Sequence, residues 1–288
     1  MIVWERMILV TFCFLDGEFR DAKDSRLPVT DLLFQRGIGV FDSMRTYDKR
    51  IFGMSKHLDR LRSSALQSGL DCEEILSVLP DIIHDGIAHS FGKDFKEFLI
   101  RAYITAGDVN NRGLFPKPRF FVIFEESHPV PEDLKCNGIS LFPVNMFRET
   151  PEVKSTNYMA PFVSMKDASS DDFEALYVYN GDVTESASSS FFICKDNKVI
   201  TPPVGKVLYS ITRDFVLTLC KEYGIEVVER SISIDELRVA DEAFIAASNK
   251  EILGVVKVGD FLIADGKVGT LTNRISDLFT ENFHRWVD

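Results

Sequence analysis

Two residues in the second half of the chain carry groups that could act together on a carbonyl compound. Lys154 stands among small and apolar neighbours, and a desolvated lysine loses proton affinity and becomes a nucleophilic amine that can form a Schiff base. Glu185 is a carboxylate that could face a ring nitrogen and keep it protonated. A lone lysine is more often a solvated surface group and a lone glutamate more often a loop residue, so neither identifies a site by itself.

Two further segments offer hydrogen-bond donors for an anion such as a phosphate group. The stretch VLYSITR (207–213) opens a predicted helix at Ile211-Thr212, where free amides and a hydroxyl form an anion cradle. A predicted strand over 242–247 ends in Ser248 and Asn249, whose side chains and amides could bind more oxygen atoms. An ordinary helix cap and an ordinary strand end are the alternatives for these two segments.

Hydrophobic periodicity predicts the elements that position these residues. In the first half we expect helices from near Ser55 and over about 73–89, where Pro80 could kink or split the helix, and strands over 8–15, 18–19, 40–47, 98–105 and 119–124. In the second half we expect a helix over 212–223 that stops at Gly224, and strands over 139–143, 175–179, 190–194, 198–201, 225–230, 242–247 and 255–258.

Runs of strands with helices grouped between them favour an α+β (α/β) fold class with mixed sheets and two domains. The segment EESHPVPEDLKCN (125–137) has two prolines, four acids and little periodicity, which is typical of a linker. We therefore predict an N-terminal α/β domain over 1–125, a linker over 126–137, and a C-terminal domain over 138–288 that carries Lys154.

Composition excludes several classes of protein. Of the 288 residues 45% are apolar and 27% charged, and the net charge is −11, which disfavours nucleic acid and anionic membranes as partners. The sequence contains no run of 18 apolar residues, so we expect no membrane span. The apolar stretch 7–15 is followed at once by Asp16-Gly17, so we interpret it as a first strand, with the true start left open between Met1 and Met7.

Cysteine and histidine usage points to a cytoplasmic protein without a metal site. The five cysteines are scattered with no CxxC motif, which indicates reduced thiols. The five histidines show no ligand spacing, and phosphate-loop, nucleophile-elbow and HExxH motifs do not occur.

Taken in order, the four segments resemble the fold-type IV (class IV) pyridoxal-phosphate enzymes. That family includes branched-chain aminotransferases, D-amino-acid aminotransferases, (R)-selective amine transaminases and aminodeoxychorismate lyases. The first half of the chain adds similar motifs: Lys56 to Leu61 (KHLDRL), Gly37 to Arg45 (GIGVFDSMR), and Ile100-Arg101 with Gly107-Asp108. The resemblance covers roughly residues 10–270.

The resemblance implies pyridoxal 5'-phosphate as cofactor, a homodimer, and a role for each matching residue. Lys154 would form the Schiff base and move the substrate proton, and Glu185 would pair with the pyridine nitrogen. The phosphate would be held by Arg60, Ile211, Thr212, Ser248 and Asn249, with Tyr158 near the cofactor phenolate and Phe41, Arg45 and Arg101 on the substrate side.

Departures from the family pattern bear on the substrate. The family commonly has other residues at Ser186, Ser190, Ser210 and Gly254. Phe41 and Ala106 disfavour the D-amino-acid subclass, which usually has tyrosine and arginine there, although Leu99 replaces a tyrosine common in the branched-chain subclass. We expect transamination between an amino acid of the branched-chain type and a 2-oxo acid. The alternatives are a lyase that releases pyruvate from aminodeoxychorismate and a non-catalytic degenerate member; stereopreference stays open.

Overall fold

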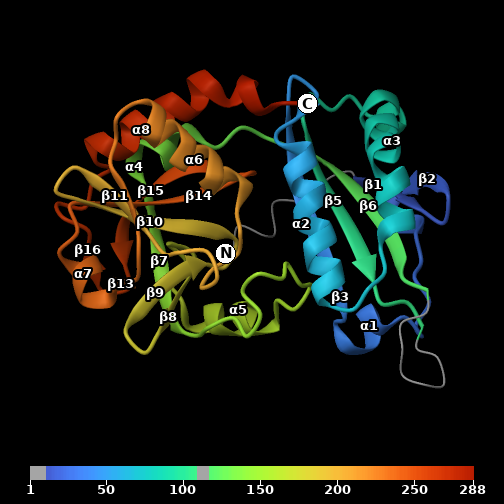
Figure 1. The fold of residues 1–288 in the computed structure, drawn as a ribbon, viewed down its shortest axis with the longest axis horizontal. Coiled ribbons are helices and arrows are strands. Elements are labelled where there is room, and N and C mark those ends of the chain that lie inside the picture. The colour runs from blue at the N-terminus through green and yellow to red at the C-terminus, as the bar shows by residue number, and fades with distance from the viewer. Residues whose placement is uncertain (1–10, 109–116) are drawn as a thin grey trace. The chain divides into compact units, whose positions relative to one another are not determined.

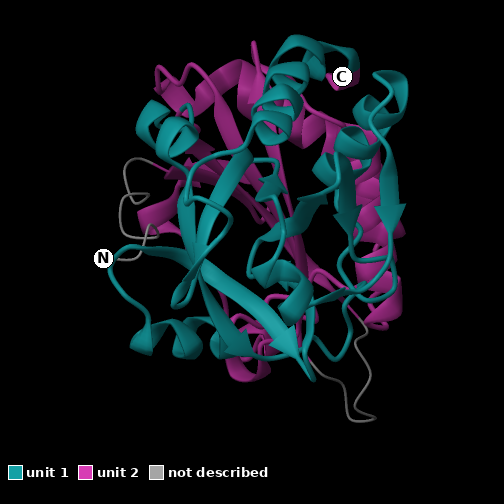
Figure 2. Ribbon diagram, turned by 90° about the vertical axis from the view of Figure 1, so that its left-hand side faces the viewer, with its two compact units in different colours: residues 1–5, 129–152, 159–285 teal, residues 6–128, 153–158, 286–288 magenta. Residues whose placement is uncertain are grey.

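In this computed structural model, which describes residues 11–108 and 117–288, the chain forms two units built on separate sheets (Figure 1, Figure 2). Unit 1 holds Pro129–Glu152 and Met159–Arg285, and unit 2 holds the described residues up to His128 together with Val153–Tyr158 and Trp286–Asp288. Lys154 therefore packs with unit 2, whereas the sequence prediction placed it in a C-terminal domain. The predicted linker over 126–137 contains the short helix α4 (Glu132–Asn137).

Unit 2 is built on a six-stranded sheet in the order β2-β1-β6-β5-β3-β4, in which every neighbouring pair is antiparallel. Its strands are β1 (Thr11–Leu15), β2 (Glu18–Asp21), β3 (Gly39–Tyr47), β4 (Arg50–Ile51), β5 (Phe98–Thr105) and β6 (Arg119–Glu126). Residues 8–10 of the predicted first strand lie outside the described residues. Successive side chains of a strand point to opposite faces, so each strand of this sheet contributes residues to both of its faces.

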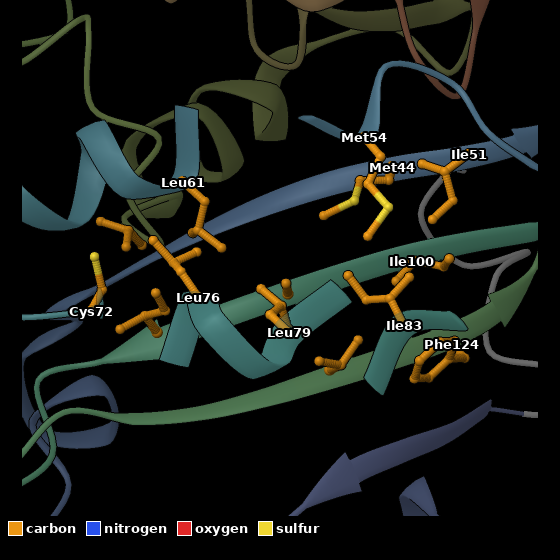
Figure 3. Close-up of a cluster of buried hydrophobic side chains, with 14 of the residues drawn as sticks. Met44, Ile51, Met54, Leu61, Cys72, Leu76, Leu79, Ile83, Ile100 and Phe124 are labelled. Carbon is orange, nitrogen blue, oxygen red and sulfur yellow. The ribbon is translucent and has the colours of Figure 1, made fainter. Parts of the chain in front are cut away.

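One face of this sheet is a hydrophobic core covered by two helices (Figure 3). The helices are α2 (Met54–Gln67) and α3 (Glu73–His89), and α3 continues unbroken past Pro80. Leu61 of α2 and Ile83 of α3 are fully buried against Met44 of β3 and Phe124 of β6. The remaining short elements of this unit are η2 (Ala22–Asp24), α1 (Leu32–Arg36) and η3 (Ser90–Gly92).

Unit 1 is built on a sheet that closes on itself. Strand β9 pairs with both β8 and β10, and the ladder then runs through β14, β15 and β7 back to β8, which makes a six-stranded ring. The ring strands are β7 (Ile139–Asn145), β8 (Asp172–Tyr179), β9 (Asp182–Ser186), β10 (Ser189–Lys195), β14 (Glu242–Ala247) and β15 (Glu251–Val258). Strands β11 (Lys198–Thr201), β12 (Val227–Glu229), β13 (Ile232–Ser233) and β16 (Phe261–Leu262) extend it.

The helices of unit 1 include two long ones, α6 (Ile211–Glu222) and α8 (Thr270–Asn282), which pack together through Phe215 and Phe279. The start of α8 is anchored by Glu242, which accepts hydrogen bonds from the amides of Leu271 and Thr272. The shorter helices are α4, α5 (Met159–Ser164), η4 (Met165–Asp167), α7 (Ile234–Arg238) and η5 (Phe283–Trp286). Within the described ranges no helix has the length and apolarity needed to cross a membrane.

Candidate active site

The backbone of Lys154 pairs with the first part of β3 in unit 2, on the side where β4 covers only Thr46 and Tyr47. The amide of Lys154 donates to Ser64 Oγ at 3.1 Å, and its carbonyl accepts from the amide of Phe41 at 3.0 Å. One step further, the amide of Thr156 donates to the Gly39 carbonyl at 3.0 Å. Residues 153–156 therefore act as a short added strand, although sequence periodicity gave no sign of one.

Strand alternation then decides where the Lys154 side chain points. Val153 belongs to the hydrophobic core, so Lys154 turns to the opposite face of the sheet. Its Nζ lies 4.7 Å from the centroid of the Phe41 ring. A Cβ at Gly39 would lie 2.9 Å from Leu33 Cδ1 and 3.2 Å from the Ile104 carbonyl oxygen, so the absence of a side chain there leaves room for these two residues.

Aromatic rings line the sheet face onto which Lys154 points. The Phe41 ring stacks on Tyr103 at 5.3 Å between centroids, and Tyr103 stacks on Phe121 at 4.7 Å. The ring of Tyr158 lies 5.9 Å from Phe41. Burial raises the pKa of the Tyr103 hydroxyl, so this residue stays neutral at physiological pH. We call Phe41, Tyr103 and Phe121 the aromatic wall.

The two arginines predicted on the substrate side both lie in unit 2. Arg101 of β5 forms an ion pair with Glu125 of β6. Glu125 lies two residues beyond Ile123, which stands opposite Arg101. Burial raises the pKa of Glu125, and the Arg101 charge opposes this rise. Arg45 is only 4% exposed, and its guanidinium lies 4.8 Å from the centroid of the Tyr47 ring.

Arg60, predicted to hold a phosphate, takes part in a buried polar cluster on the helix-covered side of β3. Its Nε donates to Asp42 Oδ2 at 2.7 Å and its Nη2 donates to Asp42 Oδ1 at 2.8 Å. His57 Nδ1 lies 2.6 Å from Asp42 Oδ1. Burial alone would raise the pKa of Asp42, but the Arg60 and His57 contacts hold it well below its usual range, so Asp42 is an anion.

His57 is neutral in this cluster. Burial lowers its pKa more than the neighbouring Asp42 raises it. A neutral ring that donates from Nδ1 to Asp42 keeps Nε2 as an acceptor, and this atom is buried without a hydrogen-bond partner among the described residues. The cluster therefore holds the Arg60 guanidinium in one orientation.

Glu185 lies on β9 of unit 1, a strand that the sequence prediction missed. It is 5% exposed, its Oε1 accepts from Arg148 Nη1 at 3.3 Å, and its Oε2 accepts from the amide of Leu208 at 3.2 Å. In the ladder it stands opposite Ser190 of β10. A buried carboxylate is thus held from two sides by donors in the same unit.

The helix that was predicted to carry an anion cradle, α6, begins at Ile211. Ser210 caps the helix by accepting from the amide of Arg213, and first-turn amides such as those of Ile211 and Thr212 have no partner within a helix. Thr212 Oγ1 lies 3.2 Å from Ser248 Oγ, so the start of α6 meets the residue that follows β14. Asn249, in contrast, is exposed.

The predicted site residues therefore fall into two sets. Lys154, Arg60, Tyr158, Phe41, Arg45 and Arg101 lie in unit 2, and Glu185, Ile211, Thr212, Ser248 and Asn249 lie in unit 1. The sequence analysis missed Arg148, Ser64, Asp42 and His57, which contact these residues. Asp42 and His57 stand inside the motifs that matched the family, but strand and helix phase was needed to see that they face each other.

The chain matches the family model for amino-transferase class IV over residues 39–258. It is 32% identical over 95% of its length to a Methanocaldococcus jannaschii protein named "Putative branched-chain-amino-acid aminotransferase", of which the match covers 96%. It is 26% identical to the D-alanine aminotransferase of Staphylococcus haemolyticus, over 97% of this chain and 99% of that one.

Solved structures agree with these relatives. The branched-chain amino acid aminotransferase from Escherichia coli superimposes with a TM-score of 0.82 at 26% identity, over 97% of this chain and 99% of that chain. The protein belongs to the class IV aminotransferases. It is a pyridoxal-phosphate-dependent transaminase with the mixed α+β fold expected from its sequence.

Each of these donors fits one part of pyridoxal phosphate. A primary amine at Lys154 suits its aldehyde, and a buried carboxylate at Glu185 suits its pyridine nitrogen. A helix N-terminus with the hydroxyls of Thr212 and Ser248 suits its phosphate. Among the described residues no group of three or more His, Cys, Asp or Glu side chains could hold a metal ion.

We predict that Asp42→Asn destabilises the protein strongly near neutral pH, because it leaves the buried Arg60 charge without its counter-ion. Breaking such a buried pair costs about 3–5 kcal/mol of unfolding free energy. The native pKa of Asp42 lies below its unfolded value, so its stabilisation is complete above pH 3.8 and is lost as pH falls through the native pKa. Denaturant unfolding of both proteins checks this: their difference in unfolding free energy should be constant from about pH 8 to 7, above the range in which His57 titrates. A variant as stable as the wild type would contradict it.

Proposed function

We propose that this transaminase moves the amino group of a branched-chain amino acid to a 2-oxo acid, with Lys154 and Glu185 as its catalytic residues. The observation that carries the proposal is the aromatic wall beside the Lys154 amine. An apolar surface next to the reacting amine favours an apolar substrate side chain, since burying each methylene group contributes about 0.8 kcal/mol.

Lys154 is proposed to hold and move the proton between the substrate Cα and the cofactor. When bound, pyridoxal phosphate supplies an electron sink that stabilises a carbanion at Cα. The backbone contacts of Lys154 with Ser64 and Phe41 leave only its side chain to move, so the amine samples a small volume. Proton transfer needs the amine within hydrogen-bond reach of the reacting atom, and this restriction favours such a geometry.

Glu185 is proposed to bind the protonated pyridine nitrogen. Arg148 and the Leu208 amide orient its carboxylate, and its burial removes competing water. For the phosphate we propose the α6 amides of Ile211 and Thr212, the Ser248 hydroxyl and Arg60, with a contribution from Asn249. Tyr158 is proposed near the phenolate oxygen, and Phe41, Arg45 and Arg101 on the substrate side.

Support for a branched-chain substrate comes from the relatives as well as from the aromatic wall. The Methanocaldococcus jannaschii and Escherichia coli proteins carry branched-chain names, whereas the Staphylococcus haemolyticus protein is a D-alanine aminotransferase at lower identity than the first. Phe41 and Ala106 also depart from the residues typical of the D-amino-acid subclass.

We further propose that the protein is a cytoplasmic homodimer. Light scattering would then give twice the chain mass of 32.7 kDa, and a monomeric mass would refute the dimer.

Lys154→Ala should abolish transamination and leave the fold intact, because the side chain points away from the hydrophobic core. Turnover is followed with the best donor of the wild type, and folding by circular dichroism. In parallel, borohydride treatment of the wild-type holoenzyme should attach the pyridoxyl group to Lys154, as peptide mass mapping would show. A label on another lysine, or residual turnover near the wild-type rate, would remove Lys154 from its role.

A donor panel tests the substrate class. With 2-oxoglutarate as acceptor, L-leucine, L-isoleucine and L-valine should give a kcat/KM at least about tenfold above D-alanine and an (R)-amine, which corresponds to about 1.4 kcal/mol of transition-state discrimination. Aminodeoxychorismate serves as the control substrate. Faster turnover of D-alanine, or release of pyruvate from aminodeoxychorismate, would replace the branched-chain proposal by another activity of the family.

A further inference from the structure

The hairpin that follows Glu185 has an unusual turn. Strands β9 and β10 are joined by Ala187 and Ser188 alone, with Ser186 opposite Ser189. Two-residue hairpins favour turns with a positive φ at the first central residue, because their twist matches that of the strands. Every other two-residue hairpin among the described strands obeys this, with first central residues Asp16, Asp48, Asn180, Asp196 and Gly259. Neither Ala187 nor Ser188 has a positive φ.

A buried carboxylate holds this turn in place. Glu174 of β8, which is 5% exposed, accepts from Ser186 Oγ at 2.6 Å, from Ser189 Oγ at 2.7 Å and from Ser188 Oγ at 2.8 Å. Ser186 Oγ is also 3.1 Å from the Ser189 carbonyl across the turn. Hydroxyls on three of the four turn residues thus converge on one anion.

Lys250 balances that anion from a second turn. Its Nζ donates to Glu174 Oε2 at 2.8 Å, to Ser188 Oγ at 2.6 Å and to Ser189 Oγ at 3.1 Å. Burial would raise the pKa of Glu174, but Lys250 and the serine hydroxyls lower it below its usual value, so Glu174 is an anion. We call Glu174, Ser186, Ser188, Ser189 and Lys250 the turn cluster.

The turn cluster joins the two turns that carry proposed cofactor ligands. Glu185 directly precedes Ser186, and Ser248 precedes Lys250 by two residues in the turn between β14 and β15. Because Ser190 of β10 stands opposite Ala246 of β14, both turns lie at the same end of these strands. The ring of strands also closes here, where β9 pairs with β10.

We propose that Lys250 is a positioning residue, which holds the Glu185 carboxylate and the Ser248 hydroxyl in register with each other through Glu174 and the serine hydroxyls. The inference rests on the roles proposed above for Glu185 and Ser248. A turn whose own twist opposes the hairpin needs outside contacts to keep one geometry, and buried charge-assisted hydrogen bonds supply them. Losing the Lys250 charge would leave Glu174 buried without its counter-ion and free the turn.

The test compares Lys250→Met with Lys135→Met. Lys135 is a matched control, because it forms a 2.9 Å ion pair with Glu251, which follows Lys250 in the chain but is not one of the five residues of the turn cluster. Lys250→Met should raise the dissociation constant of pyridoxal phosphate and lower kcat, each about tenfold, the size typical of residues that orient a directly binding group. KM for the amino donor should stay unchanged, and the near-ultraviolet circular dichroism of bound cofactor should weaken. Lys135→Met should match the wild type, and Lys250→Arg should restore part of the loss.

A second variant keeps the test independent of folding. If Lys250→Met does not fold, Ser188→Ala removes one bridging hydroxyl, and we expect shifts in the same direction but smaller. Wild-type cofactor affinity, dichroism and kcat in the folded variant would overturn the proposal, whatever its melting temperature. Affinity and dichroism are measured without substrate, so they stay decisive even where the donor panel refutes the branched-chain substrate.

Discussion

One backbone interaction decides where the Lys154 amine lies: the pairing of residues 153–156 with the part of β3 that β4 leaves uncovered. That pairing sends Val153 into the hydrophobic core and Lys154 to the other face, where its amine lies over Phe41. An amine on a free loop would sample many positions and lose the benefit of orientation. Here the main chain is fixed by Ser64 and Phe41, so the side-chain torsions alone remain.

The two faces of the β3 strand carry different groups. On the covered face Asp42 binds Arg60 and His57 in a dry environment, which costs desolvation energy and yields a rigid guanidinium. On the other face the aromatic wall stays partly exposed and available to a substrate. In unit 1 the ring of strands closes at the turn that directly follows Glu185.

Much of the fold could be predicted from the sequence, because hydrophobic periodicity fixes long elements. Strands Phe98–Thr105, Lys198–Thr201 and Glu242–Ala247 and the helix Glu73–His89 have the predicted bounds. Strand β9 was missed because DVTES has too few apolar residues to show alternation, and the pairing of residues 153–156 depends on a partner more than a hundred residues away. The ion pair of Asp42 has its partner 18 residues away in the sequence, and that of Glu174 has its partner 76 residues away. Neither pair could be read from local periodicity, and the roles of these residues in the site remain predictions.

A crystal structure of the holoenzyme tests the central claim most directly. We expect the Lys154 amine bonded to the aldehyde carbon of the cofactor, with a Glu185 carboxylate oxygen within about 3 Å of the pyridine nitrogen. A cofactor bound through another lysine, or a Lys154 amine turned into solvent away from the ring, would contradict it.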